Sequence, residues 1–218
     1  AFTQGLLWYD GALYESTGLH GRSEVRRTSP WSGAIEARHV LDPQLFGEGL
    51  ARVGERLVQL TWQSGIALVY DLRTLTPVDS FAYEGEGWGL TYDGSQLIMS
   101  DGSSTLSRRD AADFALRDVL EVTLDGRPLR NLNELEWAGG AIYANLWQDD
   151  RIVRIDPASG RVTAVIDAAG LLAPAERARV DVLNGIAYDP ASETFWLTGK
   201  LWPKTFQVRF VPATSPQR

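Results

Sequence analysis

Short apolar segments alternate with polar turns along this chain, and the alternation repeats at intervals. In the first copy, QGLLWYDGALY (4–14), a glycine precedes an apolar run, a polar turn and a second apolar pair. Five related stretches align on one anchor position each, namely Gly5, Gly49, Gly89, Glu134 and Gly185. These anchors are 44, 40, 45 and 51 residues apart. Internal periods of this length are typical of folds built from repeated sheets.

Each copy predicts a β-hairpin. The second apolar pair begins eight residues after the anchor in four copies and ten residues after it in the fifth, at Leu13-Tyr14, Leu57-Val58, Leu97-Ile98, Ile142-Tyr143 and Phe195-Trp196. Turn-forming residues separate the two apolar stretches, at Asp10-Gly11, Gly54-Glu55, Asp93-Gly94, Gly139-Gly140 and Asp189-Pro190. Such residue pairs favour tight turns between antiparallel strands.

Further strands follow most of these hairpins. Residues 66–71 (IALVYD) and 151–156 (RIVRID) alternate as third strands, and 77–83 and 161–167 are expected to be fourth strands. Helical periodicity is nearly absent, and 171–179 is the segment that could form one short helix.

Four short strands repeated five times predict an all-β fold, a five-bladed β-propeller formed by a single domain over residues 1–218. Its blades are expected to begin near residues 2, 46, 86, 131 and 182. The fifth unit ends after 205–210 and lacks an outer strand, which would have to precede Ala1 or come from 211–218. A β-sandwich would explain the short strands but not their shared spacing.

Composition narrows the classes of function. The 218 residues are 44% apolar and carry a net charge of −7 without a basic run, so neither nucleic acid nor an anionic membrane is an expected partner. The absence of cysteine excludes disulfides, thiolate catalysis and zinc–thiolate sites. No apolar stretch is long enough to span a membrane. The eight tryptophans exceed the usual share, and their positions decide whether they are core residues or walls of a ligand pocket.

Two positions of the repeat carry unexpected polar and aromatic residues. The first column, immediately before each anchor, consists of Gln4, Glu48, Trp88, Asn133 and Asn184. The second column, at the end of each second strand, consists of Gly18, Trp62, Gly102, Trp147 and Lys200. In a propeller the innermost strands line a central channel, and the first strand begins at the edge where the second strand ends. Both columns are therefore expected to open onto one mouth of the channel and to form a site.

Structural roles remain open for several of these residues. Glu48 could pair with Lys200 or an arginine, although a carboxylate walled by indoles would have its pKa raised towards the working range of a base. Asn133 and Asn184 could instead satisfy backbone groups near the channel. Three tryptophans in two neighbouring columns favour a ligand wall over ordinary core packing.

Other polar residues are expected to lie outside the site. Glu134 and Glu136 are two positions apart on one strand and should face away from it, in a structural or supporting role. Asp101 is expected to hold a turn. The two histidines, His20 and His39, have no metal-ligand spacing and are expected at the surface.

Specific motifs cover the chain in order: FTQGL (2–6), YESTGLHGRSEVR (14–26), FGEGL (46–50), QLTW (59–62), GWGLTYDG (87–94), MSDGS (99–103), LNELE (132–136), ANLW (144–147), VLNGIAYD (182–189) and TGKLWP (198–203). Together they resemble the plant-type (papaya-type) glutaminyl cyclases, or glutaminyl-peptide cyclotransferases, a family with bacterial members. The resemblance implies a five-bladed propeller without a catalytic metal or cofactor. The pocket residues that it implies are Phe2, Gln4, Glu48, Trp62, Trp88, Asn133, Trp147 and Lys200. All but Phe2 belong to the two columns, and Asn184 is a further substrate-binding candidate from the first column.

The resemblance implies that an N-terminal glutamine of a peptide or protein cyclises to pyroglutamate with release of ammonia. Our hypothesis gives Glu48 three roles, because it would bind the α-ammonium group, act as general base and then act as general acid. Gln4, Asn133 and Lys200 would donate hydrogen bonds to the amide oxygen and the oxyanion. The substrate side chain would be held bent, and water excluded, by Phe2, Trp62, Trp88 and Trp147.

Two other classes of function stay open. A calcium-dependent propeller hydrolase of the lactonase type would use Glu48, Asn133 and Asn184 as oxygen ligands, and chelators would inactivate it. A non-catalytic propeller would bind a peptide or sugar among the tryptophans without turnover. No signal peptide is visible in the chain. We expect a monomer in the periplasm or outside the cell, without a metal, nucleic-acid or membrane partner.

Overall fold

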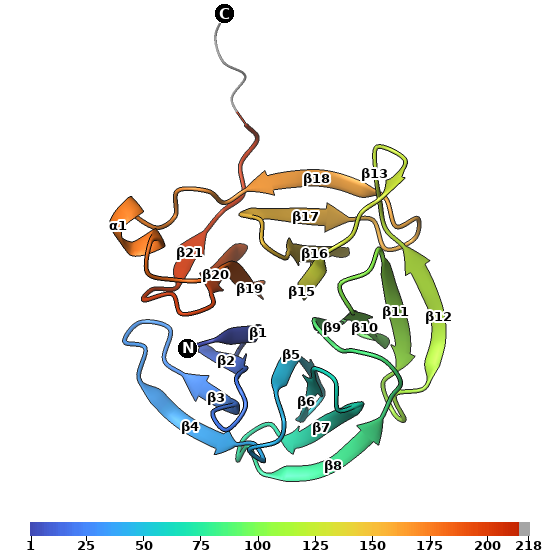
Figure 1. The fold of residues 1–218 in the computed structure, drawn as a ribbon, viewed down its shortest axis with the longest axis vertical. Helices are drawn as coiled ribbons and strands as arrows, with labels where there is room; N and C mark the ends of the chain where they lie inside the picture. The colour runs from blue at the N-terminus through green and yellow to red at the C-terminus, as the bar shows by residue number, and fades with distance from the viewer. Residues whose placement is uncertain (214–218) are drawn as a thin grey trace, which may run out of the picture.

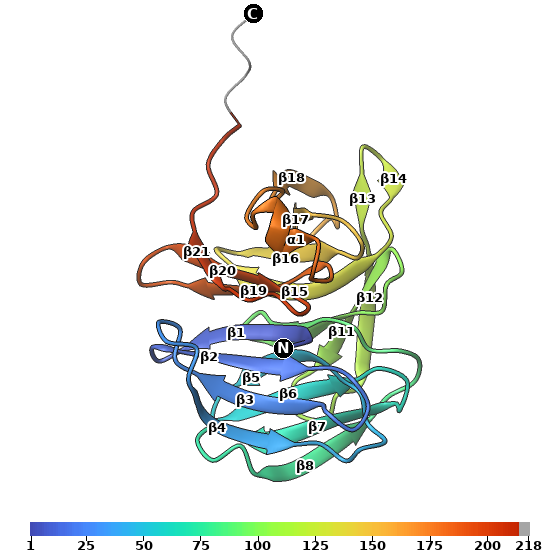
Figure 2. The ribbon, with the colours of Figure 1, turned by 60° about the vertical axis from the view of Figure 1, so that its left-hand side comes forward.

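The structure is a computed structural model and describes residues 1–213 of the chain. Five sheets are arranged radially about a central channel, and the innermost strand of each sheet lies next to the channel (Figure 1). The five-bladed β-propeller that the repeat predicts is therefore confirmed. Figure 2 shows β1 beside β19, where the first and the last blade meet.

Four of the blades are four-stranded and antiparallel, with their strands in sequence order from the channel outwards. Blade 1 consists of β1 (Thr3–Tyr9), β2 (Ala12–Thr17), β3 (Glu24–Thr28) and β4 (Ile35–Val40). Blade 2 consists of β5 (Gly47–Val53), β6 (Arg56–Thr61), β7 (Ile66–Asp71) and β8 (Pro77–Ala82). Blade 3 consists of β9 (Leu90–Tyr92), β10 (Gln96–Ser100), β11 (Thr105–Asp110) and β12 (Leu116–Glu121). Blade 4 consists of β15 (Leu132–Ala138), β16 (Ala141–Leu146), β17 (Arg151–Ile155) and β18 (Val162–Asp167).

Blade 5 has three strands within residues 1–213, namely β19 (Leu183–Asp189), β20 (Thr194–Gly199) and β21 (Phe206–Val208). Of the segment 211–218 considered for an outer strand, residues 211–213 form no strand and the remainder lies outside the described residues. A hairpin of β13 (Thr123–Leu124) and β14 (Arg127–Pro128) follows blade 3 and was not predicted. The helix α1 (Pro174–Arg177) is shorter than the segment 171–179 expected for it.

The repeated anchor glycine is explained by the close approach of the innermost strands. These strands follow one another round the channel in the order β1, β5, β9, β15, β19 and back to β1. A Cβ atom at Gly5 would lie 2.5 Å from the backbone nitrogen of Leu50, and one at Gly49 would lie 2.4 Å from that of Leu90. A Cβ atom at Gly89 would meet the next strand in the same way. Backbone cannot yield as a flexible side chain can, so these positions exclude a side chain.

Blade 4 has Glu134 at the anchor position, and its carboxylate crosses the channel. The two carboxylate oxygens accept hydrogen bonds from the backbone N–H groups of Leu6 (3.1 Å) in blade 1 and Ile186 (2.8 Å) in blade 5. Two residues further along, Glu136 accepts one from the backbone N–H of Tyr188 (2.7 Å). Glu134 therefore cross-links the innermost strands of three blades, and Glu136 adds a second link between blades 4 and 5.

The hydrophobic core is divided into five layers, one between each pair of neighbouring blades. The layer between blades 5 and 1 has the fewest buried members, which are Leu6, Leu13, Ala187 and Trp196. Trp8 stacks on Trp196 in this layer, with ring centroids 5.5 Å apart. Because every layer joins two blades, packing stabilises the closed ring rather than any one sheet.

Candidate active site

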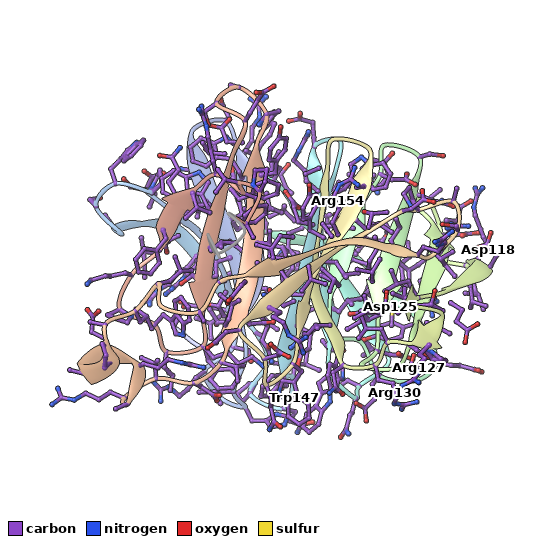
Figure 3. All side chains as sticks on the ribbon, turned by 90° about the horizontal axis from the view of Figure 1, so that it is seen from above. Asp118, Asp125, Arg127, Arg130, Trp147 and Arg154 are labelled. Carbon is purple, nitrogen blue, oxygen red and sulfur yellow. The ribbon has the colours of Figure 1, made fainter. Side chains whose placement is uncertain are left out.

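A cavity of about 390 Å³ opens at the mouth of the channel where the innermost strands begin. This channel-mouth cavity is lined by Phe2, Gln4, Phe46, Glu48, Trp62, Trp88, Asn133, Trp147, Asp181 and Lys200. The structure thus brings together all the predicted site residues except Asn184. Figure 3 places Trp147 at one face of the propeller, whereas Arg154 lies towards the opposite face.

A β-bulge aims Gln4, Glu48 and Asn133 of the first column into the channel-mouth cavity. In blade 1 the register shifts between Thr3 and Gly5, so that Gln4 has no partner on β2. The same kind of shift occurs in blades 2, 4 and 5, at the segments that contain Glu48, Asn133 and Asn184. A bulge leaves one residue unpaired and re-aims its side chain. The innermost strands can therefore present polar residues at the mouth while the rest of the ladder stays paired.

The two glycines of the second column make room for aromatic rings. A Cβ atom at Gly18 would lie 2.4 Å from the ring of Phe46, and one at Gly102 would lie 2.6 Å from the ring of Trp88. Trp88 also packs edge-to-face on Trp147, with ring centroids 5.6 Å apart. The second column thus supplies either a wall of the cavity or the space for a wall from another strand.

Glu48 is the buried carboxylate of the cavity. It is 5% exposed, and its Oε1 accepts a hydrogen bond from Nε2 of Gln4 at 2.8 Å. Burial raises the pKa of Glu48 well above its ordinary value, the positive charge of Lys200 opposes this shift, and the negative charge of Glu86 adds to it. Burial lowers the pKa of Lys200, whose ammonium lies 5.0 Å from the ring centroid of Phe2. The pKa values of the Glu48 carboxyl and the Lys200 ammonium are thus closer together than those of the free side chains, which suits proton transfer within the cavity.

Asn184 lies behind the cavity and orients one of its lining residues. Its Nδ2 donates hydrogen bonds to the backbone carbonyl of Thr3 (3.0 Å) and to Oε1 of Gln4 (3.2 Å). Gln4 in turn donates to Glu48, so the three side chains form a chain of hydrogen bonds that ends on the carboxylate. Asn184 was expected to contact the substrate, but it lies outside the cavity lining. Its hydrogen bond to the carbonyl of Thr3 agrees with the alternative that it satisfies a backbone group near the channel.

Three residues at the cavity were missed in the sequence. Phe46 and Asp181 line it, and Glu86 accepts hydrogen bonds from the indoles of Trp62 and Trp88. Phe46 opens the FGEGL copy of a pentapeptide whose first copy supplied a predicted site residue, so the repeat contained a signal for it. Glu86 lies two residues before Trp88, a spacing that places two side chains on one side of an extended chain. Asp181 has no counterpart in the repeat.

The other polar residues considered in the sequence lie outside the cavity lining. Oδ1 of Asp101 accepts a hydrogen bond from the backbone N–H of Ser103 at 2.9 Å, which holds a turn. His20 is exposed, whereas His39 is half-buried and packs on Tyr70 with ring centroids 5.6 Å apart. His39 is therefore less of a surface residue than expected.

The cavity lining provides a poor set of ligands for a divalent cation, because indoles and an ammonium group surround Glu48. A calcium site formed by Glu48, Asn133 and Asn184 would lack one ligand, because Asn184 lies outside the cavity lining and donates a hydrogen bond to Gln4. Within residues 1–213, no group of three or more His, Cys, Asp or Glu side chains is placed to hold a metal ion. Over the same residues, no helix has the length and apolar character needed to cross a membrane.

Comparison with known proteins identifies the family of this chain. The model of the glutamine cyclotransferase family matches residues 1–210. The chain belongs to the glutamine cyclotransferase family. A glutaminyl-peptide cyclotransferase of Arabidopsis thaliana is 43% identical over 221 residues, which cover 99% of this chain and 69% of the relative.

Solved structures place the same family on this fold. The crystal structure of the Myxococcus xanthus glutaminyl cyclase matches with a TM-score of 0.89 and 42% identity, and covers 96% of this chain and 90% of that one. The hydrazine synthase of Kuenenia stuttgartiensis is 15% identical, has a TM-score of 0.55 and covers 90% of this chain and 55% of that one. The second likeness concerns the fold alone, whereas the first joins fold and sequence in one glutaminyl cyclase.

Proposed function

We propose that this chain cyclises the N-terminal glutamine of peptides and proteins to pyroglutamate and releases ammonia. The observation that carries the proposal is the buried carboxylate of Glu48 among amide, ammonium and indole side chains. Membership of the glutamine cyclotransferase family supports the cyclisation reaction, which requires a group that removes a proton from the attacking amine and returns it to the leaving nitrogen. A cavity at the end of a channel also suits a substrate that is the end of a polypeptide.

Proton transfer is assigned to Glu48. The α-amino group of the substrate, after its ammonium form has lost one proton to solvent, attacks the δ-carbonyl carbon of its own side chain. As the new C–N bond forms, Glu48 accepts a proton from the attacking nitrogen. It delivers this proton to the side-chain nitrogen, which leaves as ammonia when the tetrahedral intermediate collapses. The raised pKa of Glu48 brings the carboxyl closer in proton affinity to the nitrogens that it serves.

Oxyanion stabilisation is assigned to Gln4, Asn133 and Lys200, all of which line the cavity. The Gln4 amide retains a second N–H after it donates to Glu48, and that N–H is free for the substrate oxygen. The ammonium of Lys200 contributes a positive charge in a site with little water, where electrostatic interactions are stronger than in bulk solvent. The loss of one such donor typically reduces kcat on the order of 10²-fold.

The aromatic lining is assigned to positioning. Cyclisation requires the flexible glutamine side chain to fold back onto its own α-nitrogen, and a narrow wall reduces the number of other conformations. The residues that form this wall are Phe2, Trp62, Trp88 and Trp147, together with Phe46. Exclusion of water by the same rings also strengthens the hydrogen bonds made to the oxyanion.

Three further properties belong to the proposal. The reaction proceeds without a metal ion or cofactor, because side chains of the cavity lining serve for both proton transfer and charge stabilisation. The chain acts as a monomer, and it works in the periplasm or outside the cell on peptides and proteins that begin with glutamine. Size-exclusion chromatography with light scattering tests the oligomeric state.

The activity is tested by incubating the protein with a peptide that begins with glutamine, with and without EDTA, and measuring ammonia and the mass of the peptide. We expect equal conversion in both conditions. Glu48→Gln should lose activity by more than about 10²-fold, because it removes a group with several roles. Glu84→Gln, which changes an exposed carboxylate of the β8–β9 loop, should retain the wild-type rate. Absence of conversion by the wild type, or full turnover by Glu48→Gln, would contradict the proposal.

A further inference from the structure

Glu86 lies in the loop between β8 and β9 and contacts two walls of the channel-mouth cavity. Its Oε2 accepts hydrogen bonds from the Nε1–H groups of Trp62 (2.9 Å) and Trp88 (3.1 Å). Its Oε1 accepts one from Nε2 of Gln63 (2.8 Å). One carboxylate therefore connects a tryptophan at the end of blade 2's second strand with a tryptophan that leads into blade 3.

These contacts fix the orientation of both indoles. An indole has one hydrogen-bond donor, so the direction of its N–H group determines how the ring is turned. The far edge of Trp88 lies over Gly102, where a Cβ atom would come within 2.6 Å of the ring. Trp62 packs against Phe46, with ring centroids 5.7 Å apart. Each ring is thus held at its N–H group by Glu86 and elsewhere by packing.

We propose that Glu86 is a positioning residue of the active site, which holds Trp62 and Trp88 in the orientation that shapes the cavity for a glutamine side chain. This inference rests on the proposed function. Glu86 is not part of the cavity lining, so it acts through the two indoles. Hydrogen bonds to an ionised acceptor are stronger than those between neutral groups. Hydrogen bonds from Gln63 and Trp88 lower the pKa of Glu86, which favours the ionised acceptor.

The same carboxylate acts on Glu48 through its charge. The charged and titratable groups that face Glu48 are Lys200, Glu86 and Tyr83, with Asp181 next to Lys200. Burial raises the pKa of Tyr83 to about 12, so this phenol is neutral over the working range. Removal of the negative charge of Glu86 should lower the pKa of Glu48. The unprotonated base would then persist to lower pH.

The variants Glu86→Gln and Glu86→Ala distinguish the two effects of Glu86, which are its hydrogen bonds to the indoles and its negative charge near Glu48. Glutamine keeps a carbonyl oxygen that can accept from both indoles, so this variant should keep most of the maximal kcat/KM and move the acid limb of its pH profile to lower pH. Alanine provides neither the acceptor for the indoles nor the negative charge. The kcat/KM of Glu86→Ala should therefore fall on the order of tenfold to a hundredfold, because small displacements of positioning groups have effects of this size. Glu84→Gln is the matched control in the same loop and should change neither quantity. Thermal unfolding of each variant verifies that the fold is intact.

A second measurement is independent of catalysis. Acrylamide quenching of tryptophan fluorescence should increase in Glu86→Ala, and the increase should vanish when Trp62 and Trp88 are both replaced by phenylalanine. Wild-type quenching with wild-type kcat/KM in Glu86→Ala overturns the inference. If Glu86→Ala does not fold, Glu86→Leu, which also lacks a hydrogen-bond acceptor, takes its place, and wild-type quenching with wild-type kcat/KM in that variant overturns the inference. If the wild type does not cyclise the peptide, the proposed function fails, and the quenching comparison alone decides whether Glu86 holds the indoles.

Discussion

The proton affinity of Glu48 is set by two opposing surroundings. Removal from water disfavours the ionised carboxylate, while the ammonium of Lys200 favours it. Burial is the larger effect, so the pKa of Glu48 stays above its ordinary value. Lys200 therefore has a second effect beyond any contact with substrate, because its charge keeps part of Glu48 available as a base.

Replacement of Lys200 by methionine should reduce kcat/KM on the order of 10²-fold and move the acid limb of the pH profile to higher pH. Without the ammonium, the pKa of Glu48 rises further, so at a given pH a larger fraction of Glu48 already carries its proton. The pH dependence of kcat/KM measures this shift, whose direction is opposite to that expected for Glu86→Gln. A limb that stays in place would show that Lys200 does not act on Glu48.

In the innermost strand, the β-bulge lets one residue serve catalysis while its neighbour meets the packing requirements of the fold. The anchor glycine and the apolar residue after it are required by the approach of neighbouring strands, whereas the residue before the glycine is not. In neighbouring blades this position holds Gln4 and Glu48, which differ in charge but occupy equivalent places. Two adjacent residues of one strand should therefore respond to substitution in opposite ways.

Glu48→Gln should unfold at a higher temperature than the wild type at neutral pH while it loses activity. The substitution removes a buried ionisable group, keeps an oxygen that can accept from Gln4 and breaks no ladder hydrogen bond. Gly49→Ala should instead be less stable by about 1–3 kcal/mol, because its Cβ atom would lie 2.4 Å from the backbone nitrogen of Leu90. Thermal and denaturant unfolding measure both effects. If Glu48→Gln and Gly49→Ala were destabilised equally, catalysis and folding would not depend on different residues of this strand.

The repeat allowed the sequence to predict the positions of most first-column side chains, with Asn184 as the exception. The common start of the innermost strands predicted that Gln4, Glu48 and Asn133 would meet, and in the structure they do. Asn184 occupies the same column, but its amide is taken by Thr3 and Gln4, a contact between the first and last blades that no local pattern encodes.

Side chains that come from loops could not be placed in the same way. The role of Glu86 depends on the approach of two indoles from different strands, and Asp181 reaches the cavity from the long connection after β18. The hairpin of β13 and β14 was missed because it is an insertion between blades that has no counterpart elsewhere in the repeat.

At the scale of the whole molecule, Glu134 and Glu136 of β15 connect neighbouring blades, and in these positions the ionised form of each carboxylate is disfavoured. Burial raises the pKa of Glu136 to about 8 and also raises that of Glu134. When the pKa of an acid is higher in the folded than in the unfolded state, the folded state favours the protonated form, here because removal from water disfavours the charge. The stabilisation that results is complete below the unfolded pKa of 4.5 and is lost as the pH rises through the folded value.

The melting temperature of the wild type should therefore fall, relative to that of Glu136→Gln, between about pH 5 and pH 9. The amide of this variant keeps an acceptor for the backbone N–H of Tyr188 and does not titrate. Carboxylates with a lowered pKa, such as Asp71, change their ionisation in more acidic solution and do not contribute over this range. Calorimetry at several pH values measures the difference, and parallel curves for the two proteins would contradict the assignment.

The carboxylate of Glu134, which joins β15 to β1 and β19, lies between the two ends of the channel and bears on the route of the products. Within residues 1–213, the cavity on the opposite face is lined by a separate set of residues that includes Glu136 and Trp137 and shares none with the channel-mouth cavity. We therefore expect ammonia and the cyclised peptide to leave through the opening by which the peptide entered. On this route the cyclised peptide must leave before another peptide can enter the channel-mouth cavity.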